Sequence, residues 1–176
     1  MTFFFTTLFI LLFILLSIVV FSLKNGISPM PTTGRVRRAL FDVLPNIDEG
    51  MIADLGSGWG NLIFPLASKY RTSEVIGFEN SWIPFWFSYF LNGCSNLTIK
   101  KKNFLNVSFN RCDLVLCYLF PKGMETLSKK FHKELKPGAI IVSHTFALPG
   151  WIPTKVVEAN DLHYTKIYFY RKEGTI

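Results

Sequence analysis

The chain has 176 residues, a formal net charge of +7 at pH 7 and a sequence pI of about 9.4. This length allows one domain with little to spare. The basic balance suits nucleic acid, an anionic membrane surface or an acidic partner, and it does not choose among them. Cys94, Cys112 and Cys117 show no C-x-x-C spacing, so neither a metal site nor a disulfide framework is indicated, and Cys112 and Cys117 are expected to be buried free thiols.

The N-terminal segment from Phe3 to Leu23 contains no charged residue, no glycine and no proline. As a helix it would extend about 32 Å, enough to cross the apolar core of a bilayer. A secretory signal peptide would need a basic start, a shorter apolar core and a cleavage site of small residues, and none is visible. A buried core helix is disfavoured because the segment is apolar on every face. We therefore expect residues 1–24 to form a transmembrane anchor.

Charges around this segment predict its orientation. The basic residues all follow it, beginning with Lys24, Arg35, Arg37 and Arg38. The positive-inside rule then places the C-terminal side in the cytoplasm, which makes the protein a single-pass membrane protein with a cytoplasmic domain. Residues 25–31 contain glycine and proline and are expected to be a linker, so the domain itself is assigned to residues 32–176.

The remaining chain alternates between strand and helix patterns. Thr32 or Thr33 is expected to cap a helix whose apolar face runs from Val36 to Leu44. Further helices are expected at residues 61–70, 82–91 and 122–133, and strands at residues 51–53, 74–79, 97–100, 112–118, 139–144, 155–158 and 164–171, the last two as an antiparallel pair. The alternation predicts an α/β, Rossmann-like, seven-stranded and mostly parallel sheet with helices on both faces.

The helix expected at residues 82–91 is unusually aromatic, with Trp82, Trp86, Tyr89 and Phe90 among its residues. Packing against the sheet accounts for only one face. The other aromatic side chains suit lipid headgroups, where tryptophan and tyrosine are favoured, or a hydrophobic substrate protein. Core packing alone is the third interpretation.

A glycine-rich turn follows the first strand. Gly56, Gly58 and Gly60 form the pattern G-x-G-x-G, which differs from the nicotinamide fingerprint G-x-G-x-x-G. Glycine tolerates positive φ and lets a ligand touch the backbone. Asp54 precedes the turn, and Glu79 ends the second strand, where a carboxylate is well placed to accept hydrogen bonds from ribose hydroxyls. The combination resembles motif I and the following acid of class I S-adenosylmethionine (SAM)-dependent methyltransferases, with a ligand-free turn as the alternative.

Stretches in the second half of the chain resemble a particular family. They lie at residues 118–121, 133–138, 142–146 and 148–151, and residues 29–32 resemble the family's Pro-Thr element. The family is that of small protein-lysine methyltransferases, which includes an archaeal broad-specificity enzyme and mitochondrial enzymes that modify ATP synthase c-subunit and adenine nucleotide translocase. Its mitochondrial members also carry an N-terminal membrane segment. The resemblance covers about residues 29–153 and implies SAM as cofactor and a protein substrate, with membrane proteins among the candidates.

The resemblance implies a role for each matching residue. The methionine end of SAM would be held by Asp54, Gly56, Gly58 and Gly60, the ribose by Glu79, and the adenine by Asn103 and Phe104. Thr32 would close over the cofactor, and Tyr118 would line the methyl-transfer opening. Trp59 and Asn61 depart from the family pattern, which usually has an aspartate and often an arginine there. Pro65 should kink the first helix or shift its start.

Transfer to lysine needs a neutral amine, and an apolar channel beside a sulfonium disfavours the ammonium form. Phe120, Phe146 and Trp151, together with Tyr118, are candidates for the channel wall, with core and loop packing as the alternative. His144 is a candidate proton acceptor near the end of the fifth strand, with a structural histidine as the alternative.

Three other functions are weighed against this one. Residues 31–41 resemble the opening element of small-subunit ribosomal RNA guanine methyltransferases, but those enzymes use an Asp/Asn-Pro-Pro-aromatic motif where this chain has residues 118–121 without it, which argues against a nucleic-acid substrate. A lipid or small amine as methyl acceptor stays open, because the anchor and the aromatic helix permit it. An inactive SAM-binding membrane module is the third, motivated by Trp59 and Pro65.

Overall fold

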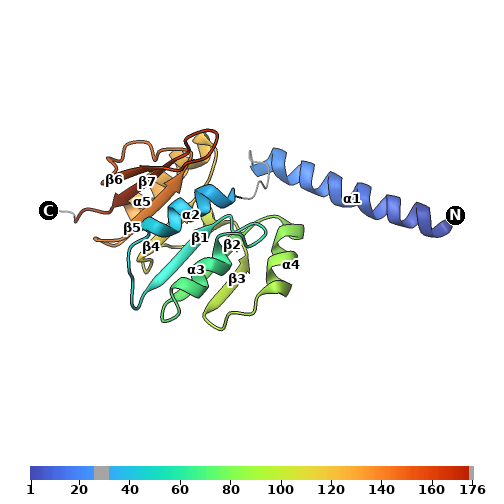
Figure 1. Ribbon diagram of the computed structural model, residues 1–176, viewed down its shortest axis with the longest axis horizontal. Coiled ribbons are helices and arrows are strands. Elements are labelled where there is room, and N and C mark those ends of the chain that lie inside the picture. The colour runs from blue at the N-terminus through green and yellow to red at the C-terminus, as the bar shows by residue number, and fades with distance from the viewer. Residues whose placement is uncertain (26–31, 175–176) are drawn as a thin grey trace.

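A single mixed sheet forms the centre of the computed structural model, which describes residues 1–25 and 32–174 (Figure 1). Its strands are β1 Met51–Leu55, β2 Glu74–Glu79, β3 Leu97–Lys101, β4 Leu114–Cys117, β5 Ile140–His144, β6 Lys155–Glu158 and β7 Lys166–Arg171. Across the described residues they form a 7-stranded sheet in the order β3-β2-β1-β4-β5-β7-β6. Neighbours from β3 to β5 are parallel, whereas β7 runs antiparallel to both β5 and β6. This confirms the Rossmann-like sheet that the sequence predicts.

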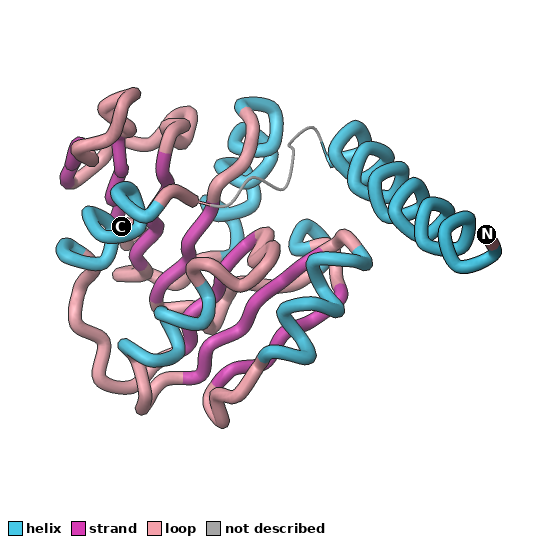
Figure 2. Tube along the Cα trace, turned by 45° about the vertical axis from the view of Figure 1, so that its right-hand side comes forward, coloured by secondary structure: helices cyan, strands magenta, loops and turns pink. Residues whose placement is uncertain are grey.

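Helices cover both faces of the sheet. In the domain they are α2 Gly34–Val43, α3 Ile63–Lys69, α4 Trp82–Leu91, the short 3-10 helix η1 Phe104–Asn106 and α5 Pro121–Glu134. Side chains of α2, α3 and α4 belong to one buried cluster and those of α5 to another, so α5 covers the opposite face (Figure 2). Thr33 caps α2, because its hydroxyl accepts a hydrogen bond from Val36 N at 3.4 Å.

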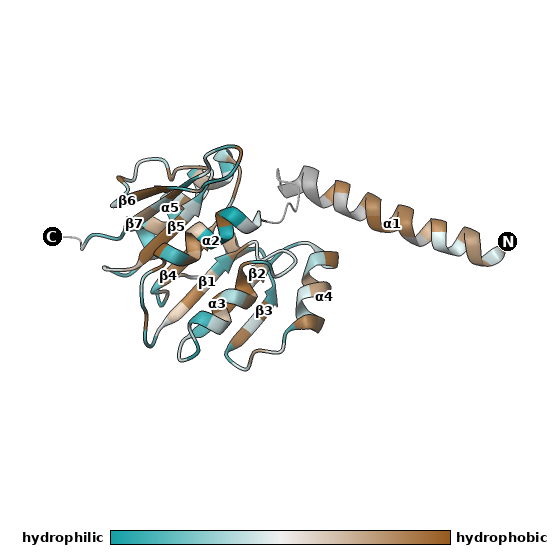
Figure 3. Cartoon of the chain, viewed as in Figure 1, coloured by the Kyte–Doolittle hydropathy of each residue, from teal (hydrophilic) through white to brown (hydrophobic). Residues whose placement is uncertain are grey.

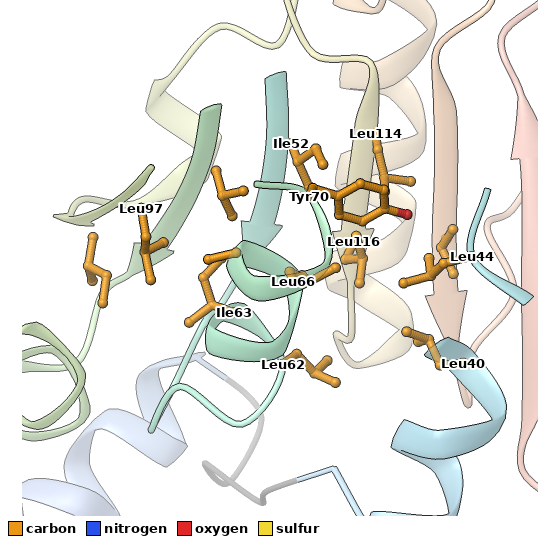
Figure 4. Packing of buried hydrophobic residues seen from close by; sticks show 14 of the residues in the cluster. Leu40, Leu44, Ile52, Leu62, Ile63, Leu66, Tyr70, Leu97, Leu114 and Leu116 are labelled. Atoms are coloured by element: carbon orange, nitrogen blue, oxygen red, sulfur yellow. The ribbon is translucent and has the colours of Figure 1, made fainter. Parts of the chain in front are cut away.

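The central strands are apolar on both sides because both faces of the sheet are covered. Along β4, Leu114 and Leu116 point into the first cluster, whereas Val115 and Cys117 point into the second. Figure 4 shows the first cluster, where side chains of α3 and α2 pack over β1 and β4: Leu62, Ile63 and Leu66, with Leu40 and Leu44, over Ile52, Leu114 and Leu116. Cys112 and Cys117 are buried free thiols, as expected.

Pro65 delays the start of the helix after β1. The helix α3 begins at Ile63 instead of residue 61, and Pro65 is its third residue. The first turn of a helix has no intrahelical partner for its N–H groups, so a proline there removes no hydrogen bond. Of the two expected effects of Pro65, a kink or a shifted start, the structure shows the shifted start.

The N-terminal segment forms α1, Thr2–Asn25, which contacts α4 and projects away from the rest of the domain (Figure 1). Most of the apolar side chains that the structure describes on this helix are exposed, as Phe3 at 83% and Phe9 at 72% illustrate. Across residues 1–25 and 32–174, no helix combines the length and the hydropathy that a membrane crossing requires. The transmembrane anchor expected from the sequence is thus not supported here and stays a prediction. Of the expected linker, residues 26–31 lie outside the described residues.

Candidate active site

The strand order reverses between β1 and β4, because β2 and β3 continue on one side of β1 while β4 and β5 lie on the other. In open α/β sheets, ligands bind outside the carboxyl ends of the strands at such a switch point. The parallel strands end there at Leu55, Glu79, Cys117 and His144. Most of the residues singled out in the sequence follow these strand ends, so the fold gathers them along one edge of the sheet.

The glycine turn leaves β1 in a conformation that glycine adopts without strain. The φ angles are +87° at Gly56, +54° at Gly58 and +94° at Gly60. A Cβ atom at Gly56 would meet nothing within 4 Å, so the space over this part of the turn is open. A Cβ atom at Gly60 would collide with the ring of Phe64. Gly60 therefore makes room for packing inside the protein, whereas Gly56 borders open space.

Glu79 ties the glycine turn to the start of α4. The side chain is buried, its Oε2 accepts a hydrogen bond from Gly58 N at 2.9 Å, and its Oε1 accepts one from Ser81 N at 2.5 Å. A carboxylate offers about four lone-pair positions, so these two bonds do not exhaust its capacity. Glu79 thus sits where the sequence places it, at the end of β2 and against the glycine turn.

Asp54 lies one residue before the end of β1 and is 4% exposed. Burial, and secondly the negative charge of Glu79, raises the pKa of Asp54 to about 7. The carboxyl is therefore partly protonated at neutral pH. A cation beside Asp54 would favour the ionised form, since an opposite charge stabilises a buried carboxylate.

An aromatic stack occupies the ends of β4 and β5. The Tyr118 ring stacks on His144 with centroids 4.2 Å apart and planes at 18°, and on Phe146 at 6.3 Å and 9°. Burial lowers the pKa of His144 to about 4, so its ring is neutral at physiological pH. The hydroxyl Oγ1 of Thr32 lies 3.3 Å from His144 Nε2. Four of the predicted residues therefore meet here, from parts of the chain far apart in sequence.

Other predicted residues lie beyond this stack. Asn103 caps η1, where its Oδ1 accepts a hydrogen bond from Leu105 N at 3.0 Å, and Phe104 packs partly buried against the cluster under α5. Both follow β3 and so reach the same edge of the sheet. Phe120 is the N-cap of α5, just after Tyr118.

Trp151 is not part of this group. Its ring stacks on His132, in the last turn of α5, with centroids 4.3 Å apart, and meets Tyr170 edge-on at 6.3 Å. Tyr170 pairs with Ile141 near the start of β5, so Trp151 packs toward the amino ends of the parallel strands. The alternative interpretation, packing, describes Trp151 better than a place in the channel wall.

Two residues at this edge make contacts that the sequence did not predict. Trp59 packs edge-to-face on Phe87 of α4, with ring centroids 5.3 Å apart, and so joins the glycine turn to that helix. Lys101 pairs with Glu79 in the β2–β3 register, donates a hydrogen bond from Nζ to Asn80 O at 2.6 Å and lies over the Trp82 ring. The signal for Lys101 was available, since neighbouring parallel strands end side by side.

Comparison with solved structures defines the class of the fold. An RNA methyltransferase from Salinibacter ruber, solved in complex with S-adenosyl-L-homocysteine, superposes with a TM-score of 0.72 at 23% sequence identity, covering 84% of this chain and 96% of that one. At this identity the likeness shows the fold, which is that of the methyltransferases.

Sequence comparison identifies the family. The ANTKMT methyltransferase domain matches residues 54–155, and the chain belongs to this family as a SAM-dependent methyltransferase. A protein-lysine N-methyltransferase of Saccharolobus islandicus is 29% identical over 147 residues, which cover 80% of this chain and 91% of the relative. The adenine nucleotide translocase lysine N-methyltransferase of Mus musculus is 31% identical over 138 residues, 73% of this chain and 58% of the relative, so the match spans little more than half of the mouse protein.

The residues present fit SAM as the cofactor. The space over Gly56 is open, and the Glu79 carboxylate holds the same turn through Gly58. The buried Asp54 carboxyl, whose pKa is raised to about 7, favours a cationic ligand at the start of the turn. SAM carries such a charge on its sulfonium, and its ribose supplies a pair of hydroxyl donors for a carboxylate.

Proposed function

We propose that this protein is a protein-lysine N-methyltransferase. The observation that carries the proposal is the match to the Saccharolobus islandicus protein-lysine N-methyltransferase, which extends over 91% of that relative. The mouse relative is likewise a lysine N-methyltransferase, and its substrate, adenine nucleotide translocase, is a protein. A methyl acceptor on a protein is therefore favoured over a lipid, a small amine or RNA.

The proposed cofactor contacts follow the sheet edge. Asp54 and the turn at Gly56, Gly58 and Gly60 hold the methionine end, and Glu79 accepts hydrogen bonds from the ribose. Asn103 and Phe104 face the adenine, and Thr32 closes over the cofactor. The open space at Gly56 and the position of Glu79 against Gly58 support this assignment.

On the acceptor side, SAM supplies an activated methyl group, so the protein mainly has to orient a neutral lysine amine and exclude water. The stack of Tyr118, His144 and Phe146 is the proposed wall of the lysine channel, with Phe120 beside it. A wall of stacked rings disfavours the charged ammonium by desolvation. With a pKa of about 4, His144 is a weak acceptor for an ammonium proton, so its proposed role is to hold Thr32 in place.

The proposal includes membrane attachment through α1, with residues 25–31 as the linker and the domain on the cytoplasmic side. Its support is the exposed apolar surface of α1, visible as brown bands in Figure 3, and the basic residues that follow the helix. A protein held at a membrane meets membrane-embedded or membrane-bound substrates most often, so a membrane protein is the proposed partner.

The test is the destination of the methyl group. Full-length protein is incubated with methyl-labelled SAM and a membrane extract, and the product is separated into protein, lipid and RNA. We expect label in the protein fraction and, after hydrolysis, in methyl-lysine. In the same assay His144→Phe, which keeps a ring on Tyr118, should raise the KM for SAM and leave kcat within a few fold, whereas loss of a true general base would lower kcat by about 10²–10⁴.

The control is Gly56→Leu, which fills the open space over the turn and should abolish labelling. Label that appears in lipid or RNA would replace the proposed substrate and leave the methyltransferase intact. No label in any fraction, from folded protein that binds SAM, would support the inactive binding module.

A further inference from the structure

One helix of the domain exposes an aromatic surface that methyl transfer does not use. The helix α4 buries Pro84, Phe85 and Ser88 against the sheet. Its remaining large side chains are exposed, and together they form what we call the aromatic face of α4: Trp82, Trp86, Phe87, Tyr89, Phe90 and Leu91. The most exposed is Phe90 at 76%. Contiguous apolar patches of this kind mark interaction sites on soluble domains.

The aromatic face is ordered by contacts within the helix. Trp86 and Phe90 are stacked, with ring centroids 5.3 Å apart and planes at 20°. Tyr89 packs edge-on against both of these rings, at 5.7 and 5.8 Å. Rings held against one another lose little further side-chain entropy when a partner binds. The side chains of the aromatic face are therefore already ordered before a partner binds.

The other long helix of the domain shows what a solvent-facing surface looks like in this protein. The exposed side of α5 carries Glu125 and Lys129, joined by a salt bridge at 2.8 Å, and its apolar side chains Met124 and Leu127 are buried. The sequence of α4 contains no charged residue at all. In Figure 3 the ribbon of α4 is white and brown, whereas that of α2 carries teal bands. An exposed helix surface that is mostly apolar and carries no charged side chain is unusual on a domain that faces only water.

Basic residues adjoin the aromatic face at its start. Strand β3 packs beside α4 and ends in a lysine run, Lys100 to Lys102, in which Lys102 is exposed. Lys101 Nζ lies 4.3 Å from the centre of the Trp82 ring, so a positive charge and an aromatic ring meet at the border of the face. Segments that lie in the interface of an anionic bilayer typically combine aromatic rings with neighbouring lysines.

We infer that the aromatic face of α4 is a membrane-contact surface that seats the domain on an anionic lipid bilayer. Tryptophan and tyrosine prefer the headgroup level, where the apolar body of the ring is buried and its polar atom stays hydrated. The apolar helix α1 contacts α4, so both apolar surfaces lie at the same end of the sheet. The inference rests on the membrane attachment proposed above and adds a second, peripheral contact that orients the domain.

This contact would fix the direction in which the active site opens. The glycine turn reaches α4 through Trp59 and Phe87, and Glu79 reaches it through Ser81 N. The same segment that contacts lipid therefore borders the proposed cofactor site. A methyltransferase bound to the bilayer in this orientation would methylate lysines that lie close to the membrane surface. Such lysines are the substrate class that the contact favours.

Hydroxyl-radical footprinting of the wild-type full-length chain tests the inference. The chain is bound to vesicles of phosphatidylcholine, with or without phosphatidylserine, and oxidation of residues 82–91 is compared with that of Tyr164. Tyr164 is 67% exposed and precedes β7, which the strand order places on the far side of the sheet from β3 and α4, so it is the matched control. We expect anionic vesicles to protect residues 82–91 but not Tyr164, and added salt to weaken the protection.

A second readout uses single tryptophans. A chain that keeps only Trp86 should shift its emission to the blue and be quenched by lipids brominated near the headgroup, whereas a chain that keeps only Trp151 should show neither effect. The same change in oxidation for residues 82–91 and for Tyr164 when vesicles are added, or protection that needs an added protein, would overturn the inference. Recovery with the vesicles reports attachment separately, and neither readout requires methyl transfer, so failure of the proposed function is distinguishable.

Discussion

Replacing Glu79 with alanine should weaken SAM binding by about 10- to 100-fold. Hydrogen bonds to a charged group contribute about 1.5–3 kcal/mol, and 1.4 kcal/mol corresponds to one decade in affinity. The substitution also removes the acceptor for the backbone N–H groups of Gly58 and Ser81, so the turn that carries the cofactor loses its tie to α4. Titration calorimetry of the full-length protein with SAM measures the effect.

The matched control is Glu74→Ala. Glu74 is the first residue of β2, at the other end of the strand from Glu79, and it is exposed. Its loss should therefore leave SAM affinity unchanged. Glu79→Gln separates the two roles of Glu79, because an amide still accepts one hydrogen bond and keeps the volume of the side chain. It should bind SAM with intermediate affinity. Equal affinity of folded Glu79→Ala and Glu74→Ala would place the cofactor elsewhere.

Asp54→Asn should change stability and cofactor binding in opposite directions. The pKa of Asp54 is raised from 3.8 to about 7 in the folded protein, so the unfolded chain releases this proton at lower pH. The ligand-free wild type therefore loses stability as pH rises from about 4 to about 7, and nothing further is lost above that range. Asparagine has no such proton, so at pH 8 the ligand-free variant should melt roughly 5–10 °C higher than wild type.

The same variant should bind SAM about 10- to 100-fold more weakly at pH 8, because the cation loses its carboxylate partner. Wild-type affinity should fall as pH drops below about 7, and the affinity of Asp54→Asn should not follow it. Melting curves and calorimetry at pH 5, 6 and 8 record both effects. A variant that is less stable than wild type at pH 8, or one that keeps the pH dependence of binding, contradicts the role given to Asp54.

The strand pattern of the domain was predictable from local sequence. Strands β2 and β6 have the bounds that the sequence predicts, Glu74–Glu79 and Lys155–Glu158, because polar or turn residues flank short apolar runs. The helix α3 could be predicted only in part. Pro65 predicts that the helix is interrupted, but it does not determine whether the helix bends or begins later. The alternation of strands and helices predicted a mostly parallel sheet but no strand order, although right-handed crossovers leave few orders open.

The side-chain environment of the site was less accessible to sequence reasoning. Trp151 and Phe146 both follow β5 and look alike in sequence, yet the first packs on His132 and the second on Tyr118. Which ring each one meets depends on how the loop after β5 lies over α5, which no local pattern encodes. The low pKa of His144 likewise arises from burial among segments distant in sequence.

The glycines of the turn differ in their surroundings, and the sequence pattern does not show this difference. Gly56 and Gly60 are equivalent in the G-x-G-x-G pattern. In the structure a side chain at Gly60 would collide with Phe64, whereas one at Gly56 would project into open space. The pattern therefore predicted a ligand-binding turn, but it did not tell which glycine borders open space and which one borders a packed ring.

SAM binding by a matched pair of glycine variants tests the cofactor site most directly. Gly56 and Gly138 have φ angles of +87° and +85°, and a Cβ atom at either would meet nothing within 4 Å. Leucine therefore strains the backbone equally at both positions, but only Gly56 borders the proposed site. Calorimetry should find no SAM binding by Gly56→Leu and wild-type affinity for Gly138→Leu. Equal affinities for SAM in the two folded variants would contradict a cofactor site on the glycine turn.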